Sequence, residues 1–307
     1  MSNVLDKVPG LAGAGRFVKP LGWASLVANI GIVVTGGAVR LTGSGLGCPT
    51  WPRCTDESFT PHGELELHSA IEFGNRLLTF VLTAVAIATF VAAWQTGRRQ
   101  LRVLALVLAL GIPAQAVIGG ITVLTDLNSW IVALHLLVSM AMVGTAVLFL
   151  RRIDDPDAVW TRGGAQTLAW ITFAAAWVVL YLGTIVTGAG PHAGDDETPR
   201  NGLDPLQMSQ LHADSVFLLI GLSIGLVFVA GTARRAVLVL LAVEAGQSVI
   251  GFVQYFTDLP EILVGAHMLG AALISAAVTW AVLAIVLRTP GQNSPAASQV
   301  RSAAVGG

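Results

Sequence analysis

AQAVIGGITVLTDLNSWIVALHLL, at residues 114–137, and GQSVIGFVQYFTDLPEILVGAHML, at residues 246–269, are two copies of one unit. They align without a gap at a constant offset of 132, which places His135 on His267. Each copy is an apolar run, a short polar hinge and a second apolar run that carries one histidine. This duplication indicates a chain built from internal repeats, with a titratable residue held inside each copy.

The composition indicates that the chain lies in a membrane. Hydrophobic residues make up 54% of the 307 residues and charged residues 11%, against about 25% charged residues in an average soluble protein. Apolar segments of about 20 residues, the length that crosses the hydrocarbon core of a bilayer, recur along the chain. They lie at residues 21–39, 67–94, 103–124, 130–150, 166–187, 209–230, 236–256 and 262–287. We therefore predict an all-α membrane protein with eight transmembrane helices, in contact with membrane lipid and without a nucleic-acid partner.

The distribution of basic residues predicts the orientation of the chain. Of its 17 Lys and Arg residues, 13 flank the predicted spans on one side, and the loops on the other side carry only Arg40, Arg53 and Arg200. Because cytoplasmic loops carry an excess of Lys and Arg, we expect a multi-pass protein of the cell membrane with both termini in the cytoplasm. Residues 1–20 then form a cytoplasmic N-terminal segment, and residues 289–307 a disordered cytoplasmic tail.

A second similarity extends the repeat to the whole membrane domain. Val34–Gly36 at the end of the first span matches Val186–Gly188 at the end of the fifth. Counting back from the arginine pairs that follow spans two and six places His212 opposite Asn75 to within one residue. These matches predict two four-helix units related by a pseudo-dyad along the membrane normal. The units comprise residues 21–150 and 166–288.

The loop after the first span carries three candidate functional residues. Arg40 lies where the helix meets the outer interface, either as an interfacial anchor or as a counter-charge for an anionic ligand such as a carboxylate. Cys48 and Cys54 are the only cysteines. Because thiols outside the cytoplasm tend to oxidise, we expect a disulfide within this loop. Its role is either that of a structural staple or that of a redox group.

The second span begins with polar side chains on one helix face. His68, Glu72 and Asn75 share that face because they are spaced i, i+4 and i+7, and Arg76 is placed to pair with Glu72. A carboxylate and a guanidinium inside a membrane helix need partners or water. The pair is therefore either a structural ion pair or part of a site that opens outward.

Three histidines lie at comparable depth near the outer ends of spans four, six and eight. Facing histidines on two helices of one four-helix bundle, here His212 and His267, are the arrangement that holds a haem iron between two imidazoles. Zinc would need three or four ligands, and neither cysteines nor clustered acids supply them. Glu244, inside span seven, is a further candidate for a polar contact or a proton path.

The motif GGAVRLTGSGLGCPTWPRC at residues 36–54, followed by IEFGNR at residues 71–76 and by one histidine near the outer end of spans four, six and eight, resembles the bacterial haem A synthase family. The resemblance covers residues 20–288. It implies oxidation of the methyl group of haem O to the formyl group of haem A, for the assembly of terminal oxidases. It also implies haem O synthase and terminal oxidase assembly factors as partners.

Carried over position by position, the resemblance implies two haem sites. His212 and His267 match the ligands of a cofactor haem b in the C-terminal unit. The N-terminal unit would bind the substrate haem O, with His135 as one axial ligand. Glu72 matches the catalytic glutamate of the family, where it would accept protons or stabilise a cationic intermediate. Cys48 and Cys54 match the cysteine pair of the family.

One departure concerns the ligand opposite His135. The family usually has E-x-x-H in the second span, whereas Asn75 stands here at the place of the histidine and is a poor iron ligand. Either His68 replaces it, or the substrate iron keeps an open face and His68 bonds a propionate. Arg40 is a further candidate partner for the haem carboxylates, and Arg76 would balance the charge of Glu72.

Two other functions compete with this interpretation. The first is a bis-histidine, cytochrome b-like electron carrier, against which Glu72 and Arg76 count because they occur in one unit only. The second is a transporter with histidines that couple protons. It would require helices broken near the middle of the membrane, whereas the glycine-rich stretches of this chain lie at the outer ends of the spans.

Overall fold

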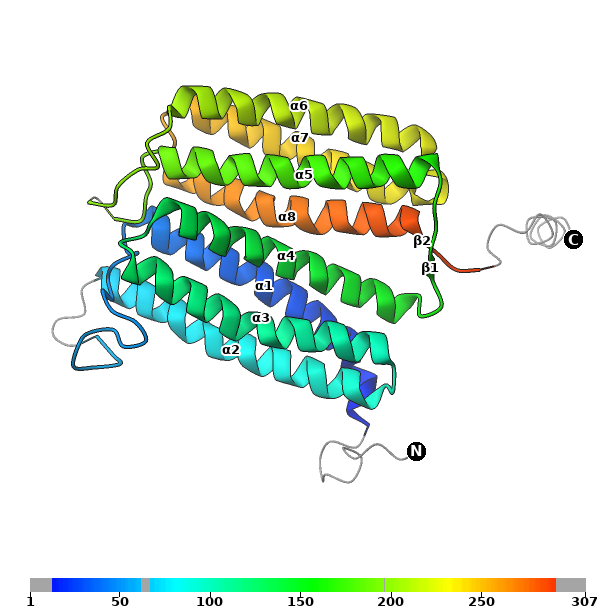
Figure 1. The fold of residues 1–307 in the computed structure, drawn as a ribbon, viewed down its shortest axis with the longest axis horizontal. Coiled ribbons are helices and arrows are strands. Elements are labelled where there is room, and N and C mark those ends of the chain that lie inside the picture. The colour runs from blue at the N-terminus through cyan, green and yellow to red at the C-terminus, as the bar shows by residue number, and fades with distance from the viewer. Residues whose placement is uncertain (1–12, 62–66, 196, 291–307) are drawn as a thin grey trace, which may run out of the picture.

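The computed structural model describes residues 13–61, 67–195 and 197–290. A short 3-10 helix, η2 (Ala14–Phe17), leads into the first of eight long helices in this part of the chain (Figure 1). They are α1 (Val18–Leu41), α2 (Leu67–Gln95), α3 (Arg99–Leu124), α4 (Ser129–Asp154), α5 (Gly164–Ala189), α6 (Pro205–Val229), α7 (Arg234–Phe256) and α8 (Glu261–Val286). A further 3-10 turn, η3 (Gly231–Ala233), precedes α7.

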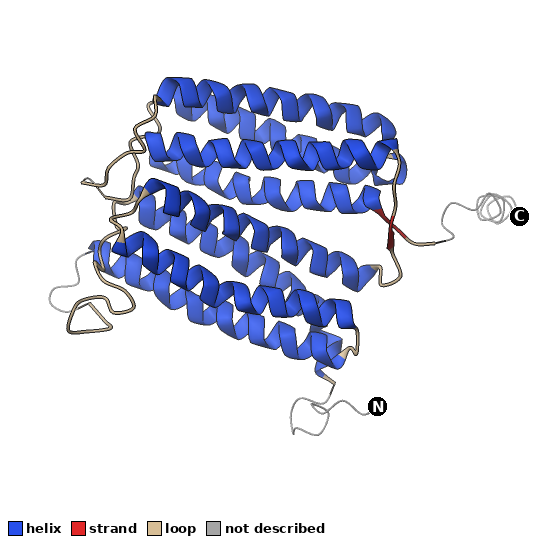
Figure 2. Ribbon diagram, in the orientation of Figure 1, coloured by secondary structure: helices blue, strands red, loops and turns tan. Residues whose placement is uncertain are grey.

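All eight helices are long and apolar enough to cross a membrane. Their ends fall within four residues of the predicted spans, and helix dominates the described chain (Figure 2). The prediction of an all-α, multi-pass membrane protein is therefore confirmed. Most of the predicted N-terminal segment and nearly all of the predicted disordered tail lie outside the described residues.

The helices gather in two groups of four that lie side by side (Figure 1). We call α1–α4 the N-terminal unit and α5–α8 the C-terminal unit. They meet where α1 and α4 pack against α8, and where α4 packs against α5. α8 is accordingly the most deeply buried of the eight helices. The buried core that joins the units is rich in alanine, for example at Ala146 and Ala281, and small residues let helices in a membrane approach closely.

The duplicated sequence builds the same backbone turn twice. The hinge residues Asp126–Leu127 and Asp258–Leu259 all adopt positive φ angles, between 51° and 58°. Such angles are uncommon for residues other than glycine. In each copy the amide of the hinge leucine donates a hydrogen bond of 2.8 Å to the carbonyl five residues earlier. The two copies of the repeat therefore share the same structure, including the backbone conformation of the turn.

A small clasp joins the units at the end of the molecule where α1 begins and α8 ends. β1 (Val159–Trp160), in the connection between α4 and α5, pairs antiparallel with β2 (Leu287–Arg288), which directly follows α8 (Figure 2). Arg152 donates a 2.6 Å hydrogen bond to the Ala158 carbonyl, and Arg151 reaches the Leu287 carbonyl at 3.3 Å. Basic residues at this end thus fix the connection between the two units.

Candidate functional site

A cavity of about 440 Å³ lies inside the C-terminal unit. This volume falls in the range of small-molecule and cofactor sites. Helices α5, α6, α7 and α8 all contribute to its wall, and α4 of the other unit adds Leu136, Leu137 and Met140. The wall is mostly apolar, and His212 and His267 are among its polar side chains.

The two histidines face each other across this cavity from α6 and α8. Their ring centroids are 6.5 Å apart, and the ring planes make an angle of 81°. An iron bound by one nitrogen of each ring at about 2 Å would separate the centroids by roughly 6 Å. The observed separation therefore fits one iron between the two imidazoles.

The set of donors around the cavity also fits a haem better than a metal ion bound by protein alone. Among the described residues there is no group of three or more His, Cys, Asp or Glu side chains placed to hold a metal ion. A porphyrin supplies four nitrogen ligands itself and leaves two axial positions to the protein. Two opposed histidines in an apolar cavity are the donor set that this arrangement needs.

Each of these histidines packs against a glycine of the preceding helix. A Cβ atom added at Gly183 in α5 would lie 3.3 Å from Cε1 of His212, and one added at Gly251 in α7 would lie 3.3 Å from Cε1 of His267. These glycines leave the space that the imidazole rings occupy. Neither glycine was predicted to have a role, although Gly251 belongs to the Val-Ile-Gly that both copies of the duplicated stretch contain.

His135 in the N-terminal unit has the same setting. A Cβ atom at Gly119 in α3, the counterpart of Gly251, would lie 3.2 Å from Cε1 of His135. The Nδ1 atoms of His135 and His267 are both buried, and neither has a hydrogen-bond partner in the described part of the chain. Gln115 donates a 3.1 Å hydrogen bond to the carbonyl of His135, which holds α3 and α4 together at this level.

Buried positions establish the register between α2 and α6. Three buried residues of each helix correspond at a constant offset of 137. The pairs are Leu82 and Leu219, Ala86 and Ser223, and Thr89 and Leu226. At this offset Asn75 is the counterpart of His212, and Glu72 and Arg76 are the counterparts of two residues that line the C-terminal cavity, Ser209 and Ala213. The three polar residues of α2 therefore occupy the positions that, in the other unit, face the cavity.

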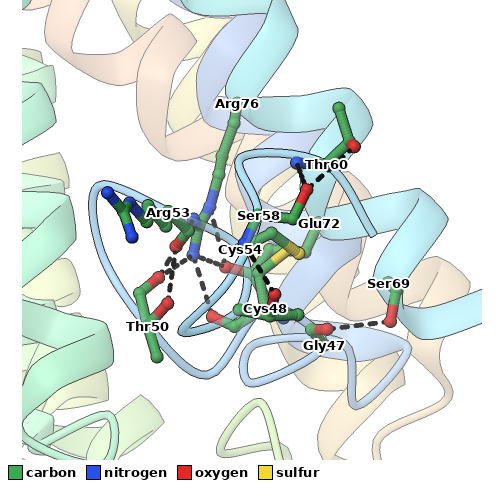
Figure 3. Close-up of a disulfide and its surroundings, with 11 residues drawn as sticks. Gly47, Cys48, Thr50, Arg53, Cys54, Ser58, Thr60, Ser69, Glu72 and Arg76 are labelled. Carbon is green, nitrogen blue, oxygen red and sulfur yellow. Dashed lines mark hydrogen bonds and ion pairs between the residues drawn. A yellow bond between two sulfur atoms is a disulfide. The ribbon is translucent and has the colours of Figure 1, made fainter. Parts of the chain in front are cut away.

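Glu72 is buried, with 5% of its surface exposed, and both of its oxygens are bonded. Oε1 accepts hydrogen bonds from Nη2 of Arg76 at 2.5 Å and from Nε at 3.1 Å. Oε2 accepts a 2.6 Å hydrogen bond from the backbone N–H of Cys48 (Figure 3). The predicted ion pair with Arg76 thus forms, and the carboxylate also holds the outer loop.

The disulfide between Cys48 and Cys54 is present, as predicted, and both half-cystines are buried. Arg76 binds the same loop through the carbonyls of Cys48, Thr50 and Arg53, at 2.9 to 3.2 Å (Figure 3). One ion pair on α2 therefore anchors the whole disulfide loop over the outer end of the N-terminal unit. The ion pair and the disulfide were both predicted from the sequence, whereas the contact between them was not.

Asn75 is engaged with α1. Its Oδ1 accepts a 2.8 Å hydrogen bond from the hydroxyl of Thr35. Gly31 in α1, the counterpart of Gly183 at the offset of the Val-Thr-Gly match, has nothing within 4 Å of an added Cβ atom. The N-terminal unit thus keeps a glycine, Gly31, at the position that corresponds to Gly183. The imidazole ring that packs against Gly183 in the other unit has no counterpart here, because Asn75 replaces the histidine.

His68 and Arg40 line a different cavity. This polar cavity of about 520 Å³ lies at the outer end, between the N-terminal unit and residues 191–195. Nδ1 of His68 is 3.0 Å from the hydroxyl of Ser44. Arg40 donates hydrogen bonds to the carbonyls of His192 at 2.6 Å and Thr187 at 2.9 Å, so that it joins the end of α1 to the end of α5.

Comparisons with known proteins agree with this arrangement. The sequence profile of the COX15-CtaA family, described as cytochrome oxidase assembly protein, matches residues 19–199. A heme A synthase of Staphylococcus haemolyticus is 30% identical over 183 residues, which cover 56% of this chain and 60% of that protein. A heme A synthase of Lysinibacillus sphaericus is 33% identical over 186 residues, covering 56% of this chain and 58% of that protein. The chain therefore aligns with about three fifths of the length of these relatives.

Proposed function

This chain belongs to the cytochrome oxidase assembly protein family, and from that premise we propose that it is a haem A synthase. The reaction would be the stepwise oxidation of a methyl group of haem O to the formyl group of haem A. The profile match ends at residue 199, before His212 and His267. The assignment of those two residues therefore rests on their own geometry.

The facing pair of His212 and His267 is the observation that carries the proposal. Two imidazoles with centroids 6.5 Å apart in a mostly apolar cavity would hold the iron of a b-type haem. Such a cofactor, when bound, supplies one-electron oxidation and reduction. The chain's own contribution is to hold the two rings opposed, with Gly183 and Gly251 behind them, and to exclude water with an apolar wall.

The substrate haem O would bind in the N-terminal unit, with His135 as one axial ligand. The polar residues of α2 support this placement because their counterparts in α6 line the cofactor cavity. Asn75 is bonded to Thr35 and His68 to Ser44. These contacts favour a substrate iron with an open or weakly ligated face opposite His135, and they leave His68 and Arg40 near the outer end, where haem carboxylates would lie.

Glu72 would be the catalytic group beside the substrate. Its carboxylate is fixed by Arg76 and by the amide of Cys48, so its orientation is set before a substrate arrives. Oxidation of a methyl group to a formyl group takes up the oxygen of a water molecule and releases protons and electrons. A positioned carboxylate is the group in this unit suited to accept the protons. Electrons would pass to the cofactor in the C-terminal unit.

The protein would work in the cytoplasmic membrane with both termini in the cytoplasm. Two features support this orientation. Basic side chains gather at the end of the bundle with the β1–β2 clasp, as expected for a cytoplasmic side, and the disulfide lies at the opposite end. Haem O synthase and assembly factors of a terminal oxidase are the partners that this reaction implies.

The test is the haem content of the purified protein, expressed beside a source of haem O. A reduced-minus-oxidised spectrum would be recorded, followed by acid extraction and chromatography of the haem. Haem B together with haem A, or with an intermediate between haem O and haem A, is the expected result. Haem B alone would replace the proposal by the bis-histidine electron carrier, and absence of any haem would refute both.

A further inference from the structure

Glu244 is a buried carboxyl group that the proposed reaction does not use. It lies in α7 with 2% of its surface exposed and lines the cavity that contains His212 and His267. Its Oε1 accepts a 2.8 Å hydrogen bond from the hydroxyl of Ser223 in α6. Its Oε2 is buried and has no hydrogen-bond partner among the described residues. A buried carboxyl group left half-satisfied at a cavity calls for a functional explanation.

The fold itself does not require a polar pair at this place. At the offsets that relate the two units, Glu244 corresponds to Ile112 and Ser223 to Ala86. Both of these residues belong to an apolar cluster of the N-terminal unit with Leu82 and Met142. In the N-terminal unit these positions are thus filled by hydrophobic contacts. In the C-terminal unit the corresponding positions hold a carboxyl group and a hydroxyl group, and the carboxyl group lines a cavity.

The position of Glu244 separates it from iron ligation. It precedes Gly251, against which His267 packs, by seven residues. That spacing is two helical turns, or about 10 Å along α7. Glu244 is therefore too far inward to be a ligand. In a water-poor interior, however, its charge acts strongly over that distance on a charge held between the two histidines.

Few other charges compete with that interaction. Besides Glu244, the titratable side chains that line the cavity are the two histidines and Tyr255, and no described Lys or Arg lines it. The remaining charged residues of α7 and of the elements packed against it, α6, α8 and η3, lie at the ends of α7 and α8 or, in the case of Asp214, at an exposed position of α6 two residues from His212. They are Arg234, Arg235, Asp214 and Glu261. The cationic partner within the cavity would accordingly be the oxidised iron itself.

We propose that Glu244, positioned by Ser223, is the proton-binding group coupled to reduction of the cofactor in the C-terminal unit. This inference rests on the proposed function. The Glu244 carboxylate would bind one proton when the cofactor is reduced by one electron, because it then loses its cationic partner. When the electron leaves, the proton is released. The cavity would thereby keep the same net charge in both redox states.

The experiment is a potentiometric titration of the purified holoprotein over a range of pH. The wild-type potential should fall as pH rises, because the ionised carboxylate favours the oxidised iron. A tenfold change in proton concentration is worth at most about 59 mV in a one-electron couple. E244Q should have a potential close to the acidic limit of the wild type, and the part of the pH slope that Glu244 causes should disappear.

Two further variants define the result. S223A removes the hydrogen bond and keeps the carboxyl group, so it should keep the slope. E261Q makes the same chemical change at an exposed position of α8 and should match the wild type. A wild-type slope and potential in E244Q would overturn the inference while leaving the proposed function intact. A wild-type protein without a bis-histidine haem would overturn both.

Infrared difference spectroscopy provides a second measurement that does not depend on the stability of E244Q. Reduction of the wild-type protein should produce a band from a newly protonated carboxyl group, and this band should shift in heavy water. Absence of such a band from the wild type would also overturn the inference.

Discussion

The two units share a scaffold and differ where chemistry is expected. In the C-terminal unit both histidine settings are complete, with Gly183 behind His212 and Gly251 behind His267. In the N-terminal unit one such pair of histidine and glycine is present, His135 with Gly119. In the second pair the glycine, Gly31, is kept, but Asn75 stands in place of the histidine. Under the proposed function, this difference separates a cofactor site with two fixed axial ligands from a substrate site whose iron keeps a free face.

The buried polar residues are distributed in opposite ways. The N-terminal unit has Glu72 and Arg76 near its outer end, where the counterparts in the other unit are small. The C-terminal unit has Glu244 and Ser223 deeper in the bundle, where the counterparts in the other unit are apolar. One unit therefore carries a carboxylate beside the proposed substrate, and the other carries a carboxyl group beside the proposed cofactor.

The largest expected effect comes from removing one member of a histidine setting. His267→Ala should lose more than about nine tenths of the low-spin b-type haem, because loss of a supporting residue alone costs ten- to a hundredfold in metal affinity. His135→Ala should keep that signal and lose product. Reduced-minus-oxidised spectra and haem extraction measure both effects. An unchanged spectrum in His267→Ala would remove the ligand assignment.

Glu72→Gln should next lower the formation of haem A by about a hundredfold or more, the size of a general acid–base contribution. The cofactor spectrum should stay intact. Arg76→Gln is the matched control because it breaks the same ion pair and spares the carboxyl group. Breaking a fully buried pair costs about 3–5 kcal/mol of stability, and this pair, in which Arg76 is partly exposed, should cost less. Yields are therefore compared per folded molecule. Normal product from folded Glu72→Gln would make Glu72 only an anchor of the disulfide loop.

The features that could be predicted from the sequence are the membrane spans and the residues that occur in both copies of the repeat. Span lengths follow from bilayer thickness, and His135 and His267 were found because the duplicated stretch shows them twice. The hydrogen bond from the Cys48 amide to Glu72 could not be predicted, because it depends on how a loop folds back onto a helix. The same holds for Arg40, which the sequence left between a lipid anchor and a carboxylate partner and which the fold directs to two backbone carbonyls.

Asn75→His tests whether the difference between the units lies in one side chain. The open space beside Gly31 should accept a ring, which would then face His135 as His212 faces His267. We expect a second low-spin signal when the protein is loaded with haem O. Turnover should fall about tenfold, equivalent to ~1.4 kcal/mol of barrier.

Asn75→Ala is the control for this change, since it removes the bond to Thr35 and adds no ligand. It should keep the wild-type spectrum. Spectra of the loaded variants and haem A yield measure the outcome. If Asn75→His gave no new low-spin signal, His135 and position 75 would not share a haem, and the placement of the substrate would have to be revised.

The smallest effect is expected at the disulfide, which the C-terminal unit lacks. There the loop between α5 and α6 is held by side-chain bonds to backbone carbonyls, such as that from Asn201 to Ile185 at 2.9 Å. Cys48→Ser opens a bridge between residues six apart, and loop-closure entropy assigns such a short bridge about 2 kcal/mol. The loop keeps its bonds to Arg76, and the amide of residue 48 can still reach Glu72.

Thermal unfolding in detergent should therefore show a lower midpoint for Cys48→Ser, while the product per folded molecule falls only slightly. Cys54→Ser and the double variant should behave in the same way, because replacing either cysteine, or both, breaks the same disulfide. If instead folded Cys48→Ser lost nearly all turnover, the thiols would take part in the oxidation. The disulfide would then be a third chemical difference between the units, beside the open iron face and the carboxylate, rather than a means of holding Glu72 in place.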